Sequence, residues 1–341
     1  MKRLNFIDKI VFLLNSIVAL MLLLSYILPR LEPKSFALIS ELSLAVPLLI
    51  IHNGLFVVYW LLKVKKQLFL SLLVLILGYG HVSSLYKFSA SKRVKSDSNI
   101  TIMNFNVRLF NLYNWIVEPD VETEIVNLIS EAAPDVISFQ EYHPHENVDL
   151  VSFPYKYEKL SGSRVRYGQA IFSKYPIVNS GSIEFPETAN NAIYADIVKD
   201  EDTLRVYNVH LQSLRIDEKV EALDKEQSER LLRRASATFI KQHSQAELFI
   251  AHKASSPYRS VICGDFNNSA YSYVYKKIKG DFKDAFEEAG NGFGRTFNFK
   301  YFPVRIDFIL VDGSFEVNGF KTYSKTLSDH FPIQAKLGLH K

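Results

Sequence analysis

Three long apolar runs near the N-terminus constrain this chain more than any other feature of its sequence. They cover residues 10–28, 42–62 and 68–86. Each run is close to the ~20 residues that an α-helix needs to cross the core of a bilayer. Polar segments separate the runs, and the aromatic residues Tyr59, Trp60, Tyr79 and Tyr86 lie near their ends, as interfacial aromatics do. We therefore expect residues 1–86 to form three transmembrane helices.

Two of these runs have an alternative interpretation. A signal peptide would explain the run at 10–28, but no small-x-small cleavage pattern follows it and two more runs do. Pro47, His52 and Asn53 interrupt the run at 42–62, where a re-entrant or interfacial segment is the alternative. We favour a spanning helix in both cases.

Positive charges give only a weak indication of orientation. If the N-terminus is inside, the inner and the outer flanking segments each carry six Lys and Arg residues. The flank before the first run is slightly more basic than the flank after it, which favours the N-terminus inside. Three spans then place the C-terminal part outside the cytoplasm. Residues 87–98 are polar, basic and rich in Ser, and we expect them to form a juxtamembrane linker.

The charge of the chain is distributed unevenly. Residues 1–95 hold 12 of the 40 Lys and Arg residues and 3 of the 36 Asp and Glu residues, so their net charge is +9. Residues 96–341 hold the other 28 basic and 33 acidic residues, which gives a net charge of −5. A broad basic surface for nucleic acid is therefore not indicated. Cys263 is the single cysteine, so no intrachain disulfide can form.

From residue 99 onward, strand-like and helix-like segments alternate. Helices are expected at 121–134, where Pro134 closes the pattern, and at 224–252. Strands are expected at 100–107, 135–141, 168–177, 192–198, 204–213, 260–268, 305–312 and 331–337.

Four of the expected strands end in polar residues of similar chemistry. These ends are Asn106 with Arg108, Gln140 with Glu141, Asn208 with His210, and Asp265 with Asn267. Asp307 follows Arg305 at the start of another strand, and Asp329 and His330 precede the last one. Apolar strands would carry these groups to one rim of a layered core, which is how a polar site is mounted on a rigid scaffold.

Seven fragments of the chain occur together in a characteristic order. They are "NFNVRLFN", "SFQE", "GQAIFSKYPI", "NVHLQS", "GDFNN", "RIDFIL" and "SDHFPI". This ordered set resembles the endonuclease/exonuclease/phosphatase superfamily, with its DNase I-like and exonuclease III-like members, over about residues 99–339. Within the superfamily it is most similar to membrane-anchored bacterial proteins, and more distantly to a lipid-remodelling branch.

The resemblance implies the fold and the location of the chain. Residues 99–341 are expected to form a catalytic domain with an α/β (α+β) four-layer sandwich. In such a sandwich two mainly antiparallel sheets pack face to face and helices flank them. With the three-helix transmembrane region in front, the protein is expected to be a multi-pass protein of a bacterial inner membrane.

The resemblance also implies a metal site. Glu141 resembles the principal Mg²⁺ ligand of the family, while Asn106 and Asp329 resemble residues that complete the site. Carboxylate oxygens are natural ligands of this hard cation, and Mn²⁺ is a possible substitute. His143 and His145 follow Glu141 closely. We favour a surface loop for them over a second metal site.

The remaining candidate residues correspond to catalytic and phosphate-binding positions of the family. The catalytic candidates are His210, Asp265, Asn267, Asp307 and His330, and the phosphate-binding candidates are Arg108, His210 and Asn267. Asp307 is expected to pair with His330 and fix its tautomer. The sequence leaves open whether Asp265 or His330 takes the proton of the attacking water. It also leaves open whether Arg108 binds phosphate or only braces Glu141.

Each fragment by itself has a simpler structural explanation. "GDFNN" is typical of an Asx turn at the end of a strand. "SDH" is compatible with a helix cap or a turn. Asp307 and Arg305 are compatible with a surface ion pair. The joint presence of all positions favours an active metal-dependent site over these explanations.

We therefore expect a membrane-anchored, Mg²⁺-dependent phosphodiesterase or phosphatase that hydrolyses a lipid headgroup or a small phosphoester. The first alternative is a membrane-anchored nuclease acting on DNA or RNA, for which Arg164, Arg166 and Arg215 could line a cleft. An alternative of another class is a non-catalytic binding or lipid-remodelling module. The expected partners are the lipid bilayer and a phosphoester substrate, and no protein partner is indicated.

Overall fold

The protein is described by a computed structural model that covers residues 4–88, 99–214 and 225–338. Most of the expected linker at 87–98 lies outside the described residues, and so does Arg215.

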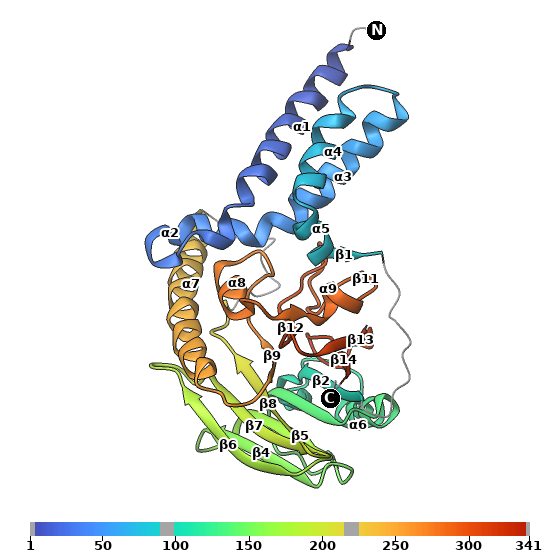
Figure 1. The fold of residues 1–341 in the computed structure, drawn as a ribbon. Coiled ribbons are helices and arrows are strands. Elements are labelled where there is room, and N and C mark those ends of the chain that lie inside the picture. Colours follow the sequence, from blue (N-terminus) through green and yellow to red (C-terminus); the bar gives the residue numbers. More distant parts are fainter. Residues whose placement is uncertain (1–3, 89–98, 215–224, 339–341) are drawn as a thin grey trace.

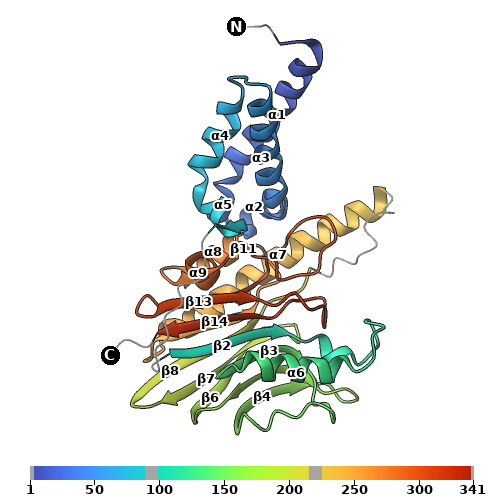
Figure 2. The same ribbon diagram turned by 90° about the vertical axis from the view of Figure 1, so that its right-hand side faces the viewer.

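Three apolar helices form a bundle that projects from the rest of the molecule (Figures 1 and 2). They are α1 (Phe6–Ser25), α3 (Val46–Leu62) and α4 (Leu68–Leu77). Two segments are long and apolar enough to cross a membrane, Phe6–Arg30 and Pro33–Leu62. The N-terminus lies at the free end of the bundle, away from the two sheets (Figure 1).

The third expected span is a bent pair of helices instead of one straight helix. α4 is followed by α5 (Tyr79–Leu85), and the two axes differ by 82°. The bend occurs at Gly78, where a Cβ atom would collide with the Tyr26 hydroxyl. That hydroxyl donates a hydrogen bond to the carbonyl oxygen of Val74 at 2.7 Å. The pair is either a broken span or a re-entrant segment.

The second expected span begins later than its apolar run. The helix α3 starts at Val46 with Pro47 in its first turn, where proline costs no hydrogen bond. The residues before it form two short elements at the foot of the bundle, α2 (Pro33–Ser40) and the 3₁₀ helix η2 (Glu41–Ala45).

The sequence after the bundle folds into two six-stranded sheets. The first sheet has the order β13 (Glu316–Thr322), β14 (Ile333–Gly338), β2 (Asn99–Asn106), β3 (Val136–Tyr142), β5 (Tyr167–Ser173) and β4 (Tyr155–Ser161). The second has the order β10 (Lys283–Asp284), β12 (Asp307–Val311), β9 (Ser260–Asp265), β8 (Asp202–His210), β7 (Asn191–Lys199) and β6 (Ile177–Glu184).

Each sheet is antiparallel except for one central pair. β2 and β3 are parallel in the first sheet, and β8 and β9 are parallel in the second. A parallel pair needs a crossover connection, and a helix supplies it in both sheets. The helices are α6 (Val121–Ala132) and α7 (Lys225–Ala254). The expected fold of two mainly antiparallel sheets flanked by helices is therefore confirmed.

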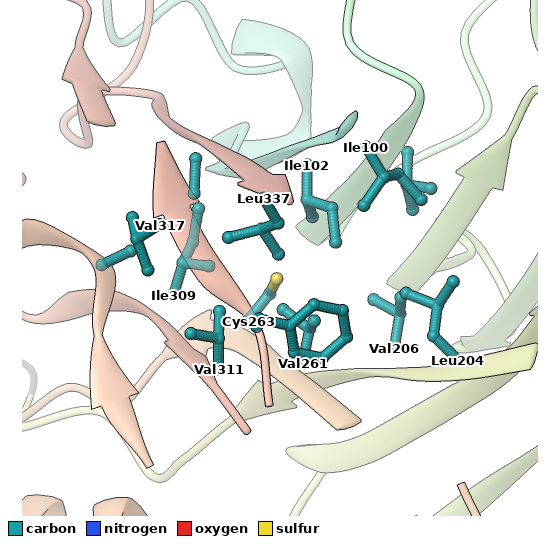
Figure 3. Packing of buried hydrophobic residues seen from close by; sticks show 14 of the residues in the cluster. Ile100, Ile102, Leu204, Val206, Val261, Cys263, Ile309, Val311, Val317 and Leu337 are labelled. Atoms are coloured by element: carbon teal, nitrogen blue, oxygen red, sulfur yellow. The ribbon is translucent and has the colours of Figure 1, made fainter. Parts of the chain in front are cut away.

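The hydrophobic core divides into three layers of side chains. Between the sheets, Ile102 and Leu337 from one side pack with Val206, Cys263 and Ile309 from the other (Figure 3). The helix α6 covers the outer face of the first sheet, while α7 and α8 (Tyr273–Lys279) cover the outer face of the second. Each fully buried Ile or Leu contributes ~1.5–3 kcal/mol, so these layers hold the strand ends in place.

Some elements differ from the sequence-based expectation. The expected strand at 168–177 is two strands, because β5 ends at Ser173 and Ile177 begins β6 in the other sheet. The strands β4 and β13 and the short helix α9 (Ala285–Ala289) were not expected. β4 is an edge strand whose residues are mostly exposed, so it lacks the apolar pattern of a buried strand.

The foot of the helical bundle is joined to the sandwich by side-chain and backbone contacts. β1 (Tyr86–Lys87) pairs with β11 (Gly292–Phe293) directly after α5. The Tyr271 hydroxyl donates to the carbonyl oxygen of His81 at 3.2 Å, and the two rings stack. Lys34 of α2 pairs with Glu247 of α7 at 2.9 Å. The apolar helices and the sheets therefore share one junction.

Candidate active site

The two parallel strand pairs bring the expected polar residues together. Within the second sheet, Asp265 of β9 is paired with His210 of β8 on one side and with Asp307 of β12 on the other. In the first sheet, Asn106 at the end of β2 is paired with Gln140. The ends of the central strands in both sheets thus meet at the same edge of the sandwich, as expected from the sequence.

Asn106 connects the two sheets at this edge. Its Nδ2 donates to Asp265 Oδ2 at 3.0 Å and to Glu141 Oε1 at 3.3 Å. Glu141 lies at a β-bulge of β3 and has a left-handed φ of 49°. A non-glycine residue in this conformation is strained, and such strain is common at functional sites. Ser328 donates to the backbone oxygen of Asn106 at 2.9 Å.

A tight turn fixes Asp265 and Asn267. Gly264 has a φ of +155°, and a Cβ there would collide with the carbonyl oxygen of Val209. The Asn267 backbone N–H donates to Asp265 Oδ1 at 2.8 Å, as in an Asx turn. The side-chain nitrogen of Asn267 donates to Leu211 O at 3.0 Å and to Asp265 Oδ2 at 3.2 Å. The Asx turn at the end of β9 therefore also positions the Asp265 and Asn267 side chains in the candidate site.

His330 pairs with Asp307 in the arrangement expected from the sequence. The distance from His330 Nδ1 to Asp307 Oδ2 is 2.9 Å, and His330 Nε2 lies 3.7 Å from Asp265 Oδ2. Burial lowers the pKa of His330, but the carboxylates of Asp307 and Asp265 outweigh it and raise the pKa well above its ordinary value. Thr296 Oγ1 accepts the backbone N–H of Asp307 at 3.0 Å.

His210 lies on the other side of Asp265, and its pKa shifts in the opposite direction to that of His330. His210 Nε2 is 3.8 Å from Asp265 Oδ2 and is buried, with no hydrogen-bond partner among the residues that the structure describes. Burial and the charge of His330 lower the pKa of His210 to about 3. Burial also raises the pKa of Asp265 to about 7, against the opposing effect of His330. Around this buried carboxyl group, the pKa of one imidazole is therefore raised and the pKa of the other is lowered.

Arg108 contacts Asp329 in the structure. Its Nη1 lies 3.2 Å from Asp329 Oδ2, and its guanidinium group stacks over the Trp115 ring at 4.5 Å. Asp329 is adjacent to His330 and receives a hydrogen bond from Ser328 at 3.1 Å. Arg108 is therefore held next to a candidate metal ligand.

At this edge of the sandwich, two groups of side chains could hold a metal ion. Glu141, Asp329 and Asn106 are the set expected from the sequence, and their ligand atoms are oxygens. Asp265, Asp307 and His330 form a second set, with ligand atoms all within 4.8 Å of one another. In the second set, His330 Nδ1 already forms a hydrogen bond with Asp307. Oxygen ligands suit Mg²⁺, which makes the first set chemically more suitable.

Several of the other polar residues have structural contacts. Gln140 donates to Asn208 across the two sheets at 2.6 Å, so both belong to a buried amide network. Arg305 donates to Asp284 at 2.6 Å, not to Asp307. The His143 ring is hydrogen-bonded to the backbone oxygen of Arg166 at 2.7 Å, in a surface loop.

The sequence did not identify the residues that form the walls of the site. Trp115 under Arg108 and Thr296 behind Asp307 lie in irregular segments with no motif of their own. The Phe297 ring packs against His330, with 5.0 Å between ring centroids. The concentration of aromatic residues in "FNFKYFP" was the one available signal for this segment.

Comparison with known proteins agrees with the observed fold. A family model described as "Endonuclease/Exonuclease/phosphatase family" matches residues 103–330. A second, described as "Domain of unknown function (DUF8431)", matches residues 8–85. No curated protein matches the chain in sequence.

Solved structures resemble the part of the chain that contains the sheets. A humanized TDP2 from D. rerio has a TM-score of 0.55 and 17% identity, covering 71% of this chain and 100% of that chain. A family protein from Bacteroides vulgatus has a TM-score of 0.54 and 20% identity, with coverage of 72% and 100%. The human Nocturnin catalytic domain with a bound sulfate anion has a TM-score of 0.53 and 15% identity, with coverage of 70% and 93%. At these identities the likeness concerns the fold alone.

Proposed function

The chain belongs to the endonuclease/exonuclease/phosphatase family, whose members are metal-dependent phosphoester hydrolases, and we propose that it is a membrane-anchored phosphodiesterase or phosphatase acting on a lipid headgroup or small phosphoester. One arrangement carries this proposal. Asp265 lies among Asn106, His210 and His330, drawn from both sheets, at one end of a cavity that the N-terminal helices also line.

We propose Mg²⁺ as the cofactor, held by Glu141, Asp329 and Asn106. Burial and the negative charge of Asp329 raise the pKa of Glu141, and a cation bound by both carboxylates would favour their ionised forms. Mg²⁺ prefers oxygen ligands and keeps several waters, so two carboxylates and one amide oxygen suit it. The bound cation supplies positive charge that polarises the phosphoryl oxygens.

The chain's own residues bind and position the reacting groups. A water or phosphoryl oxygen between His210 Nε2, His330 Nε2 and Asp265 Oδ2 would contact all three atoms. Asp307 holds His330 in one tautomer, which leaves Nε2 available. In hydrolysis, the water oxygen bonds to phosphorus and one ester P–O bond breaks. Asp265 or His330 accepts the water's proton, and the departing oxygen receives a proton.

The other proposed roles concern the phosphoryl oxygens. His210 and Asn267 are proposed to donate hydrogen bonds as negative charge develops there. Asn267 would then exchange its side-chain bond to Asp265 for the phosphoryl group. Arg108 is proposed to bind the phosphate from its position beside Asp329.

A hydrolysis panel tests this function. The full-length protein is incubated with a phosphoinositide, sphingomyelin, a nucleotide and plasmid DNA, with Mg²⁺ and with EDTA. We expect Mg²⁺-dependent release of phosphate or headgroup that EDTA abolishes, with Mn²⁺ able to restore it. Glu141→Gln and His330→Ala should each remove this activity. Efficient nicking of plasmid without hydrolysis of lipid or small esters would identify a nuclease and contradict the proposal.

The non-catalytic alternative predicts a different result. If the protein only binds or remodels lipid, Glu141→Gln and His330→Ala leave its cellular function intact. The hydrogen-bonded set around Asp265 argues against this outcome, because buried carboxylates and imidazoles at this density are costly to maintain without a function.

We also propose that the protein crosses a bacterial inner membrane more than once, with its catalytic part outside the cytoplasm. This rests on the two apolar helices and the bent pair, and on the position of the N-terminus at the free end of the bundle (Figure 1).

A further inference from the structure

A cavity of about 430 Å³ extends from the candidate site to the foot of the helical bundle. Its polar end is formed by Glu141, Asp265, Asp329 and His330. This volume lies within the range that small-molecule sites usually have. A substrate phosphate placed among the catalytic candidates would therefore have its substituent in this cavity.

The wall opposite the polar end comes from the N-terminal helices. Leu44 of η2, Pro47 of α3 and Leu85 of α5 all line the cavity. These residues belong to three separate elements at the junction shown in Figures 1 and 2. The membrane part therefore does more than anchor the sandwich, because it builds part of the cavity that contains the site.

A second apolar wall comes from the segment at 296–304, which we call the aromatic loop. Phe299 and Phe302 line the cavity, and their ring centroids are 5.0 Å apart. The loop is closed by backbone bridges from Phe297 to Val304 and to His330. It is thus fixed directly to the catalytic candidates, and its aromatic side chains line the same cavity as the N-terminal helices.

A second cavity, of about 570 Å³, lies on another side of Glu141 and has a different character. Glu141 and Ser213 line both cavities. The second is lined mainly by polar side chains, among them Asn190, Gln212 and Lys241. The candidate site therefore separates an apolar space next to the membrane helices from a polar space.

We propose that the apolar cavity is the subsite for the hydrocarbon chain of a membrane lipid phosphodiester, whose polar substituent occupies the second cavity. This inference rests on the proposed phosphoesterase function. A small soluble ester would leave the apolar walls in contact with water, whereas a hydrocarbon chain would cover them. A nucleic acid would have to place a charged strand against Leu44, Leu85 and Phe302, which is unfavourable.

We place the source of this chain in the bilayer because exposed apolar residues and cavity-lining residues are adjacent at the foot of the bundle. Leu42 and Leu44 belong to the same 3₁₀ helix, and Leu42 is 51% exposed while Leu44 lines the cavity. In the aromatic loop, Tyr301 is 51% exposed while Phe302 lines the cavity. The first pair offers a variant that changes the cavity and a matched control that does not, whereas the Tyr301 ring packs against the cavity-lining Phe299, with 5.3 Å between ring centroids, and is not a control.

The test measures how inhibition depends on chain length. Butyl, hexyl, octyl and decyl phosphate compete with bis(p-nitrophenyl) phosphate for the full-length protein in nanodiscs containing Mg²⁺. We expect the inhibition constant to fall at least ~10-fold from butyl to decyl phosphate, because each added methylene group is buried. Equilibrium dialysis with butyl and decyl phosphate repeats the comparison without turnover.

Variants distinguish binding of the alkyl chain in the cavity from general partitioning of the chain into lipid. Leu44→Gln and Phe302→Ala should each reduce the dependence on chain length to below ~3-fold, because both remove apolar lining. Leu42→Gln should retain the wild-type dependence. Equal inhibition by all chain lengths, or equal effects of lining and control variants, would overturn the subsite while leaving the phosphoesterase function intact. Absence of Mg²⁺-dependent hydrolysis of every ester tested would instead contradict the proposed function.

Discussion

Asp265 is the residue around which the candidate site is arranged. It accepts hydrogen bonds from Asn106 and Asn267, and the two histidines lie at nearly equal distances from it. Because these partners come from both sheets, the position of Asp265 depends on the correct packing of the whole sandwich. The pairing of His330 with Asp307 is the part of this arrangement that a single substitution can test most directly.

Asp307→Asn is expected to lower kcat by roughly 10²-fold or more while changing KM little. The neutral amide would replace the charged carboxylate that accepts a hydrogen bond from His330 Nδ1. The imidazolium then loses its electrostatic stabilisation, and the ring is no longer held in one tautomer. Steady-state kinetics on a soluble diester provides the measurement. Asp281→Asn, at an exposed position of the same domain, is the control and should have no effect. A loss of less than ~3-fold in Asp307→Asn would contradict the proposed role.

The variant His330→Ala tests whether His330 accepts the proton of the attacking water, which the sequence leaves open, or donates a proton to the departing oxygen. Both neighbouring carboxylates favour the protonated ring, so we expect His330 to donate a proton to the departing oxygen. The variant should then lose more activity on an alkyl ester than on a p-nitrophenyl ester, because nitrophenolate leaves without needing a proton. The ratio of the two losses is the measurement. Equal losses on both esters would instead indicate that His330 accepts the proton of water.

At the scale of strands and helices, the sequence predicted the elements whose pattern is local. The central strands are continuous apolar runs with polar ends, so β2, β3, β8 and β9 were expected close to their observed bounds. Edge strands such as β4 are half-exposed and carry no such pattern. At the bend between α4 and α5, Gly78 packs against Tyr26, which directly follows α1, and a contact between distant residues leaves no local signal.

The same limit applies to the candidate site. The sequence identified Asn208 and His210 alike as polar residues at the end of one strand. In the structure Asn208 bonds to Gln140 and to the Phe139 backbone between the sheets, while His210 faces Asp265. Asn208 and His210 lie on the same face of β8, so which of them enters the site depends on the position along the strand and on the register between the sheets. The resemblance to a family supplied the candidate site residues, but it could not identify the residues that form the cavity walls.

Gly264→Ala is expected to destabilise the junction of β8 and β9. The new Cβ would collide with the carbonyl oxygen of Val209 in the neighbouring strand, and the φ of +155° disfavours any side chain. We expect a loss of at least ~2 kcal/mol in the free energy of unfolding together with a loss of activity, since Asp265 follows directly. Thermal unfolding measures the loss of stability. Gly313→Ala is the control, because nothing lies within 4 Å of its new Cβ. A similar shift in both variants would contradict this explanation.

At the scale of the whole molecule, the structure combines an apolar helical bundle and a hydrolase fold in one junction. The free end of the bundle carries the N-terminus and the turn between α3 and α4, while the sandwich contacts the opposite end (Figures 1 and 2). Asp8 and Lys63, at the free end, form an ion pair between α1 and α3. If the bundle crosses the bilayer, the free end and the catalytic part lie on opposite sides of the membrane.

This arrangement predicts the result of labelling with a membrane-impermeant maleimide in intact cells. Cys263 is fully buried in the core, so the unmodified protein should give little background. Lys66→Cys places a thiol at the free end, in the exposed turn between α3 and α4, and Asp281→Cys places one on the exposed surface of the catalytic part. We expect Asp281→Cys to react in intact cells and Lys66→Cys to react only after permeabilisation, because the weak charge bias places the N-terminus inside.

The possible outcomes separate orientation from anchoring. Reaction of Lys66→Cys alone in intact cells would reverse the proposed orientation and place the catalytic part in the cytoplasm, with the bundle still crossing the membrane. Reaction of both thiols in intact cells would mean that the bundle does not cross the bilayer. The lipid subsite survives the first of these results, since Leu44, Pro47 and Leu85 meet the aromatic loop on whichever side the sandwich lies. It does not survive the second, because a hydrocarbon chain could then no longer reach the cavity from the bilayer.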